Sequence, residues 1–340
     1  MKKNYKQIPM PVRYAINILL LIVFLVVVNG LIESKTISFS DSKIIMLIGI
    51  NIILAVSLNI GTGYLGQLPL GHAGFMAVGA YASAILMRNI GASWLTIPIG
   101  MIFGGLVAAL FGLIIGIPAL RLKGDYLAII TLGFGEIIRV VLLNIDDVLG
   151  FKLTYGAASL KNIPKTTTFL NTFVVVIITC FVIHTMMKSR HGRAILSIRE
   201  NEIAAESCGI KTTYYKTLGF VVSAFFAGVA GSLYAGYLGI LSPGSFGFMK
   251  SIEILVMVVL GGMGSMIGSV ASATVLTALP EMLRTFASYR IVAYSLLLII
   301  VMIFKPSGLM GTYDFSLSHL LEKLLNSKRS IGKKSEKGGR

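Results

Sequence analysis

GYLGQLPLGHAGFMAVGAY, residues 63–81, separates two strongly apolar stretches with five glycines, a proline, a glutamine and a histidine. Proline lacks a backbone donor and disfavours helix at the residue before it, so Pro69 predicts a break between two helices. Non-helical backbone at membrane depth is tolerated only where protein buries it or where it lines a water-filled cavity. The stretch is therefore either the breakpoint of a helix lining a solute pathway or an interfacial loop. The residues expected nearest such a pathway are Gln67, Gly71 and His72.

Composition sets the class of protein. Hydrophobic residues make up 55% of the 340, charged residues only 13%, and the mean hydropathy is +0.85. The charged fraction is about half that of soluble domains, which favours an all-α, polytopic transmembrane bundle. About ten spans are expected, with broken or re-entrant segments. The apolar windows lie at 14–32, 43–60, 73–90, 94–118, 126–143, 169–187, 214–238, 251–268, 270–284 and 290–304.

The distribution of basic residues predicts the orientation of the chain. With the N-terminus inside, 20 of the 30 Lys and Arg residues fall on the cytosolic side and nine outside. Both termini are then cytosolic and the number of spans is even. The net charge of +16 is a topology signal, so no nucleic-acid partner is expected. The expected segments are a cytosolic N-terminus at 1–13, a transmembrane domain at 14–310 with a cytosolic loop at 188–213, and a basic cytosolic tail at 311–340 that lies near membrane lipid.

Small residues recur four apart in two segments. The segment at 217–237 and the segment at 260–273 both give helix faces that another helix can approach closely. These faces serve either packing within the bundle or an interface between subunits. The packing candidates are Gly228, Gly231, Gly261, Gly264 and Gly268. The GxxG at Gly261–Gly264 is also a weak counterpart of the one that opens the stretch quoted first.

Two charges lie midway along the span at 126–143. Glu136 and Arg139 are three residues apart, so they share one helix face and can neutralise each other. Ionisable residues inside a membrane are costly and indicate a functional site by default. The pair is either part of a solute pathway or a structural ion pair.

The loop at 188–213 has a helix-forming centre, RENEIAAESCG at 199–209, which ends at a glycine. Such a charged helix beside a membrane is either a docking surface or a solvated connector. The sequence holds no GxxxxGK[ST], HExxH, GxSxG or paired-cysteine motif. No catalytic, cofactor or metal residues are therefore assigned, and the chain is not expected to be an enzyme.

Several long motifs together resemble one family. RLKGDYLAIITLGFGEIIRVVL at 121–142, the segment at 192–243, SIEILVMVVLGGMGSMIGSV at 251–270 and IFKPSGLMG at 303–311 are similar to membrane permeases of bacterial branched-chain amino acid ABC transporters. The stretch quoted first resembles that family's first signature. Within the family, the chain resembles the LivM-type subunit.

The resemblance implies a bacterial inner-membrane subunit that moves branched-chain amino acids by alternating access. Its partners would be a second homologous permease, two ATP-binding cassette subunits and an extracytoplasmic solute-binding protein. The loop would couple to the ATPase through a loose E-A-A-x-x-x-G pattern. Ile203 stands where Glu is expected in that pattern. The implied coupling residues are Arg199, Glu200, Glu202, Ala204, Ala205, Glu206 and Gly209.

Three alternatives stay open at this point. The importer could carry urea or short amides, or the chain could be an ATP-independent transporter or channel. An intramembrane enzyme is the third, and the absence of a nucleophile or metal motif disfavours it.

Overall fold

The computed structural model describes residues 22–282, apart from 24, 37, 92, 123 and 151–153, and a few residues between 292 and 308. The chain forms two compact units, residues 40–312 and residues 1–39 with 313–340. In the second of these, residues 22–33 are helical where described. The expected segments 1–13 and 311–340 lie outside the described residues, as do most of the expected span at 290–304 and the start of the first span.

The larger unit is helical, where described, apart from one β-bridge between Leu160 and Leu241. Short 3-10 turns (η2 and η3) and one π-helical turn (η1) accompany its α-helices. The elements are α2 Phe39–Asn59, η1 Ile60–Tyr64, α3 His72–Ile90, α4 Thr96–Ala119, α5 Asp125–Leu149, η2 Gly156–Ala158, α6 Phe169–Lys188, α7 Arg190–Glu200, α8 Glu202–Ser207, α9 Thr212–Leu238, η3 Pro243–Phe246, α10 Phe248–Gly261 and α11 Met266–Met282.

Seven described segments are long and apolar enough to cross a membrane. They are α2 with η1, α3, α4, α5, α6, α9 and α10 with η3, and α11 is a shorter apolar helix. The expected all-helical, multi-span fold is therefore confirmed. The cytosolic placement of both termini stays a prediction.

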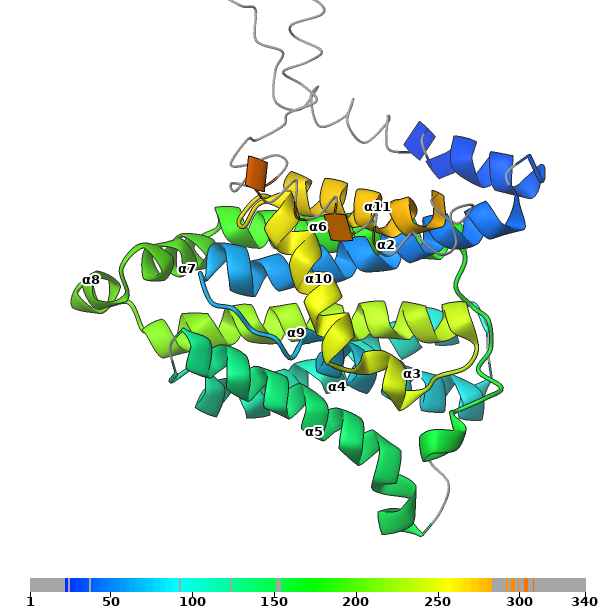
Figure 1. Cartoon of the computed structure of the whole chain (residues 1–340), viewed down its shortest axis with the longest axis horizontal. Coiled ribbons are helices and arrows are strands. Elements are labelled where there is room, and N and C mark those ends of the chain that lie inside the picture. The colour runs from blue at the N-terminus through cyan, green and yellow to red at the C-terminus, as the bar shows by residue number, and fades with distance from the viewer. Residues whose placement is uncertain are drawn as a thin grey trace, which may run out of the picture. The chain divides into compact units, whose positions relative to one another are not determined.

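Helices α3, α4 and α9 form the tightest packing in this unit (Figure 1). A Cβ atom added to Gly79 of α3 would meet the backbone of Gly228, and one added to Gly228 would meet the Ala108 side chain and, at 2.7 Å, the carbonyl oxygen of Gly104. Backbones this close need glycine, and they maximise the van der Waals contact that holds helices together in lipid.

Gly231 of α9 also lies against α3. A Cβ atom on Gly231 would meet the carbonyl oxygen of Met76 and lie 2.9 Å from the backbone nitrogen of Ala80. Gly228 and Gly231 are therefore buried against α3 and α4 of the same chain.

The helical segment after residue 247 divides earlier than its apolar windows indicate. The windows end and restart around residue 269, whereas the structure breaks between α10 and α11 at residues 262–265. Gly262 and Gly264 have φ of +105° and +88°, values that L side chains rarely adopt and that end a helix. Gly261 and Gly268 then face each other across the turn, and each would clash with the other's backbone if it carried a Cβ atom.

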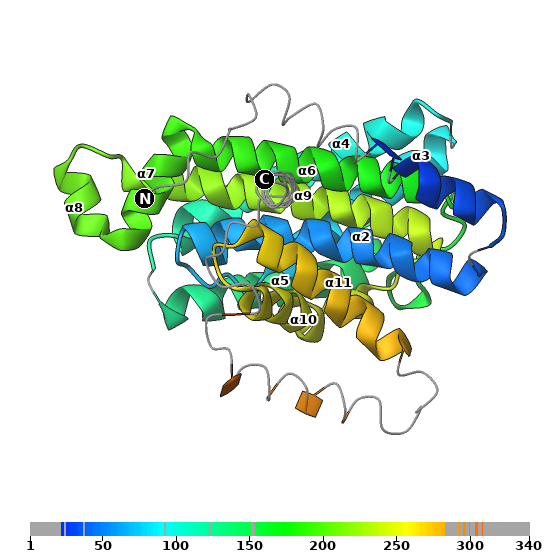
Figure 2. The same cartoon turned by 90° about the horizontal axis from the view of Figure 1, so that it is seen from above.

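Helices α7 and α8 stand at one end of the bundle. In both views they extend beyond the long helices, beside the end of α2 where η1 begins (Figures 1 and 2). Contacts of α7 with η1 and of both α7 and α8 with α9 fix their place within the unit.

The glycine contacts predict that Gly228→Ala destabilises the bundle. The added methyl group lies against Ala108 and Gly104, so the helices must move apart at a cost of about 1–3 kcal/mol. Gly133→Ala on α5 is the matched control, since its added Cβ meets nothing within 4 Å. Thermal unfolding in detergent should show a lower Tm for Gly228→Ala only. Equal Tm values for the two variants would contradict the packing.

Candidate functional site

The first helix break follows α2. The chain leaves α2 through the π-helical turn η1, where the Leu65 amide donates to the Ile60 carbonyl at 3.0 Å. Residues 65–71 are non-helical, Gly66 has φ of +69°, and α3 begins at His72. Single π-helical turns often mark functional positions within helices.

The break is enclosed by protein on the side of α5 and α10. The Leu70 amide donates to Thr131 Oγ1 at 2.9 Å, and a Cβ atom on Gly71 would meet the Thr131 carbonyl oxygen. At the start of α3, the Ala73 amide donates to Ser251 Oγ at 3.2 Å. Side-chain hydroxyls therefore satisfy amides that a continuous helix would satisfy itself, which is what burial in lipid requires.

His72 is buried within the bundle. Its side chain is 3% exposed, and Nε2 lies 3.0 Å from Ser57 Oγ on α2. The Ser57 carbonyl accepts a hydrogen bond from Ser223 Oγ of α9 at 2.7 Å. Ser223 is eleven residues from the start of α9, which is a rise of about 16 Å along that helix. His72, linked to Ser223 through Ser57, therefore lies far along α9 from its first turn. Gln67 is half-buried, and its backbone N–H donates to the Gly61 carbonyl.

The second break, at residues 262–265, lies directly against the first. Asn59, at the end of α2, accepts a hydrogen bond from the Gly264 amide at 2.9 Å and donates to the Ser265 carbonyl at 3.1 Å. A Cβ atom on Gly63 would clash with both Asn59 Oδ1 and the Gly264 amide nitrogen. One buried amide side chain thus joins the two breaks.

Arg199 adds the end of α7 to this contact. Its Nη1 donates to the Gly63 carbonyl at 2.7 Å and lies 3.1 Å from the position of a Cβ atom on Gly264. Its side-chain carbons pass 3.1–3.9 Å from the corresponding position on Gly66. We call Asn59, Gly63, Arg199, Gly264 and Ser265 the helix-break cluster.

Local capping shapes the loop that carries Arg199. Ser189 Oγ accepts the Gly192 amide at the start of α7, and Asn201 Oδ1 accepts the Ala204 amide at the start of α8. Asn201 is extended, so it ends one helix and caps the next, and RENEIAAESCG forms parts of two helices rather than one. Gly209, with φ of +80°, ends α8.

The two acids of α8 are held within the chain. Glu202 accepts from Lys216 Nζ of α9 at 2.6 Å, and the Lys216 side chain is only 4% exposed. Glu206 accepts from Thr212 Oγ1 at 2.7 Å. Ile203 is 74% exposed instead, with Ala204 also exposed and Ala205 buried. Ile203 is therefore an exposed apolar residue on α8, beside the exposed Glu206, and both acids bond residues of α9.

The predicted pair on α5 is a part-buried ion pair. Arg139 Nε donates to Glu136 Oε2 at 2.6 Å, with the two side chains 29% and 32% exposed. Glu136 Oε1 also accepts the Phe248 amide at 2.9 Å, at the first turn of α10. A carboxylate is favoured at a helix N-terminus, so the pair ties α5 to α10. The helix-break cluster lies beyond the other end of α10, so the pair is not part of it.

Sequence reasoning missed several contributors to the cluster and to the break around it, among them Asn59, Ser57 and Thr131. Asn59 and Ser57 are polar residues within an apolar window, a signal that indicates a buried role in membrane helices. Thr131 on α5 gave no comparable signal, because a single threonine in an apolar span commonly bonds its own helix, as it also does here.

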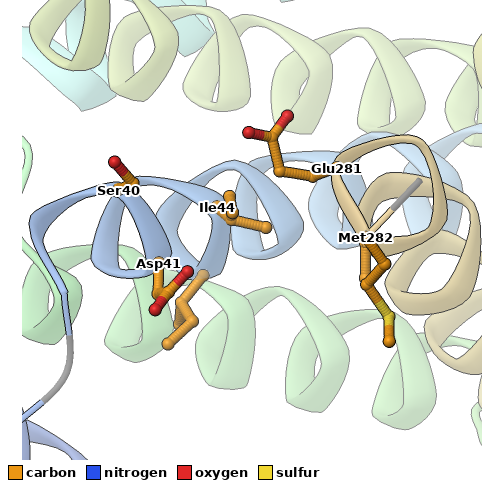
Figure 3. Close-up of a pocket in the computed structure, with 7 residues that line it drawn as sticks. Ser40, Asp41, Ile44, Glu281 and Met282 are labelled. Carbon is orange, nitrogen blue, oxygen red and sulfur yellow. The ribbon is translucent and has the colours of Figure 1, made fainter. Parts of the chain in front are cut away.

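At the other end of α2 lies a pocket of about 590 Å³ (Figure 3). Its walls come from the first turns of α2 and the last turns of α11, and they are part acidic and part apolar. The lining residues are Ser40, Asp41, Ile44, Ile45, Ala278, Glu281 and Met282. This pocket is separate from the helix-break cluster, which lies at the opposite end of α2.

A multi-span bundle with two helix breaks joined by a buried amide, and with a capped helical loop against them, is typical of membrane transport permeases. Residues 42–305 match the family described as "Branched-chain amino acid transport system / permease component", and the chain belongs to that family. It is a multi-pass transport subunit rather than an enzyme, and the family match spans both breaks and the loop.

Two kinds of bacterial permease are similar to it. The chain is 38% identical over 296 residues to the high-affinity branched-chain amino acid transport system permease protein LivM of Salmonella typhimurium, covering 77% of this chain and 68% of LivM. It is 26% identical to LivH of the same organism, covering 76% and 90%. Similarity to both implies a paired permease.

Two further likenesses are more distant. The nucleoside ABC transporter permease protein NupC of Lactococcus lactis is 26% identical over 50% of this chain and 59% of NupC. The solved structure of PsaBC from Streptococcus pneumoniae in complex with Fab has a TM-score of 0.43 and 16% identity, covering 81% of this chain and 95% of that one.

Proposed function

We propose that this chain is the membrane-spanning subunit of an ATP-binding cassette importer and forms the pathway for branched-chain amino acids by alternating access. The observation that carries the proposal is the family match over residues 42–305, together with 38% identity to LivM. Two helix breaks that meet at one end of the bundle, joined by the buried Asn59, support alternating access, because broken helices recur where transporters expose a site to one side at a time.

The proposed assembly has three other components. A second, LivH-like permease pairs with this chain, and two ATP-binding cassette subunits supply the energy. An extracytoplasmic solute-binding protein delivers the solute. The chain's own sequence has no P-loop, which fits hydrolysis in separate subunits.

The ATPase docks on the outward face of α8 in this proposal. Ile203 and Ala204 offer an exposed apolar surface on a short helix that is attached to α9 through Glu202 and Lys216. Glu202 and Glu206, which the resemblance implies for the ATPase contact, bond Lys216 and Thr212 of α9 within the chain. Basic residues in the loop, among them Arg190, Arg193 and Lys211, support its cytosolic placement.

The solute chemistry follows from the few fixed charges in the spans. Glu136 and Arg139 neutralise each other, and the helix breaks present glycine backbone and small hydroxyls. Such surroundings suit a small zwitterion with an aliphatic side chain. Urea or a short amide is the competing solute for the same kind of importer.

Transport by the assembled complex tests the function. Vesicles that contain this chain, a related permease, two ATPase subunits and a binding protein are expected to accumulate labelled leucine, isoleucine and valine when ATP is supplied. Unlabelled urea should not compete, since it lacks the aliphatic side chain and the zwitterion. Accumulation of urea alone would reassign the solute. Uptake that persists without the ATPase subunits would favour an ATP-independent transporter.

The docking face predicts the effect of Ile203→Asp. An aspartate at this position forfeits the apolar transfer energy that isoleucine gains on docking, about 1.5–3 kcal/mol, so co-purification of the ATPase should fall at least about tenfold. Ile203→Leu is the conservative control and should bind normally. Glu202→Gln should reduce ATPase co-purification only to the extent that α8 detaches from α9. Limited proteolysis of α8 measures that detachment. Unchanged co-purification of Ile203→Asp would contradict the docking face.

A further inference from the structure

Arg199, at the end of α7, bonds the first helix break and lies beside the second. In the first break, its Nη1 donates to the Gly63 carbonyl at 2.7 Å, and its side-chain carbons pass beside Gly66. In the second break, the same Nη1 lies 3.1 Å from the place that a Cβ atom on Gly264 would occupy. One side chain from the loop therefore meets two segments that are some 200 positions apart in the sequence.

Glycine at these positions makes the contact possible. Gly66 and Gly264 have φ of +69° and +88°, and a side chain on either would crowd the arginine. Asn59 fastens the second break to the end of α2, so a force on the first break reaches Gly264 and Ser265 through two further hydrogen bonds. The loop is also fixed to the bundle, because Lys216 of α9 forms an ion pair with Glu202 of α8.

The geometry points to Arg199 as a positioning residue that transmits movement of α7 and α8 to both helix breaks. This inference rests on the proposed function, in which an ATPase moves the loop. The charged donor holds the Gly63 carbonyl, so displacement of α7 displaces the π-helical turn, and Asn59 carries that displacement to the turn between α10 and α11. In this role Arg199 acts through the breaks and contacts neither ATP nor solute.

The test separates coupling from docking in the reconstituted complex. Arg199→Gln should keep ATPase co-purification and ATP hydrolysis, while the solute transported per ATP hydrolysed falls about tenfold, the size expected for losing a hydrogen bond from a charged donor. Arg199→Lys keeps the charge and a donor, and should recover most of the ratio. Arg193→Gln is the matched control on the same helix, since the Arg193 side chain donates to the Lys188 carbonyl instead.

Three results would overturn the inference. Loss of ATPase co-purification in Arg199→Gln would make the residue part of the docking surface. An unchanged transport ratio would make its contacts incidental. A loss that Arg199→Lys does not recover at all would indicate a purely structural requirement for arginine.

A second measurement stands apart from transport. Hydrogen exchange of residues 60–71 in the purified chain should quicken in Arg199→Gln and stay unchanged in Arg193→Gln, because Arg199 holds the Gly63 carbonyl and Arg193 bonds its own loop. If the wild-type complex moves no solute, the proposed function fails while this result still stands. If exchange is equal in the two variants, the positioning role fails on its own.

Discussion

The structure depends on satisfying backbone polar groups where membrane helices break. Each unsatisfied amide or carbonyl in hydrocarbon costs several kcal/mol, so a break survives only where other groups replace the helical hydrogen bonds. Asn59 does this for the Gly264 amide, and Arg199 does it for the Gly63 carbonyl. Asn59 also donates to the Ser265 carbonyl, which already accepts the Ser269 amide. The two breaks and the loop are held together by the same few contacts.

Close helix packing makes this arrangement possible. Glycine contacts hold α3, α4 and α9 close together. The first break is attached to these helices by the hydrogen bonds that Ser57 makes with His72 and Ser223. On the other side, Thr131 and Ser251 hold the start of α3 to α5 and α10. A small set of hydroxyls and one amide thus fixes the irregular backbone between well-packed helices.

Sequence reasoning reached the helical class, seven of the expected spans and the break around Pro69, because hydropathy and proline chemistry are local properties. The expected count of about ten spans stays a prediction. It also matched the GxxG at Gly261–Gly264 to the first break, and the structure places Gly264 beside Gly63. The contact itself was out of reach, because residues some 200 positions apart meet only through the tertiary fold. The bonds of Glu202 and Glu206 to α9 were out of reach for the same reason, since their partners on α9 approach only after α8 folds back on that helix.

One buried amide side chain joins the two breaks, and the proposed coupling of the loop to the pathway depends on that junction. Hydrogen exchange at the Gly264 amide tests it most directly, comparing the wild-type chain with Asn59→Leu and with Asn51→Leu, whose native side chain bonds Thr277 instead. We expect slow exchange in the wild type and in Asn51→Leu, and exchange at least about tenfold faster in Asn59→Leu. Equal exchange in all three proteins would contradict the junction.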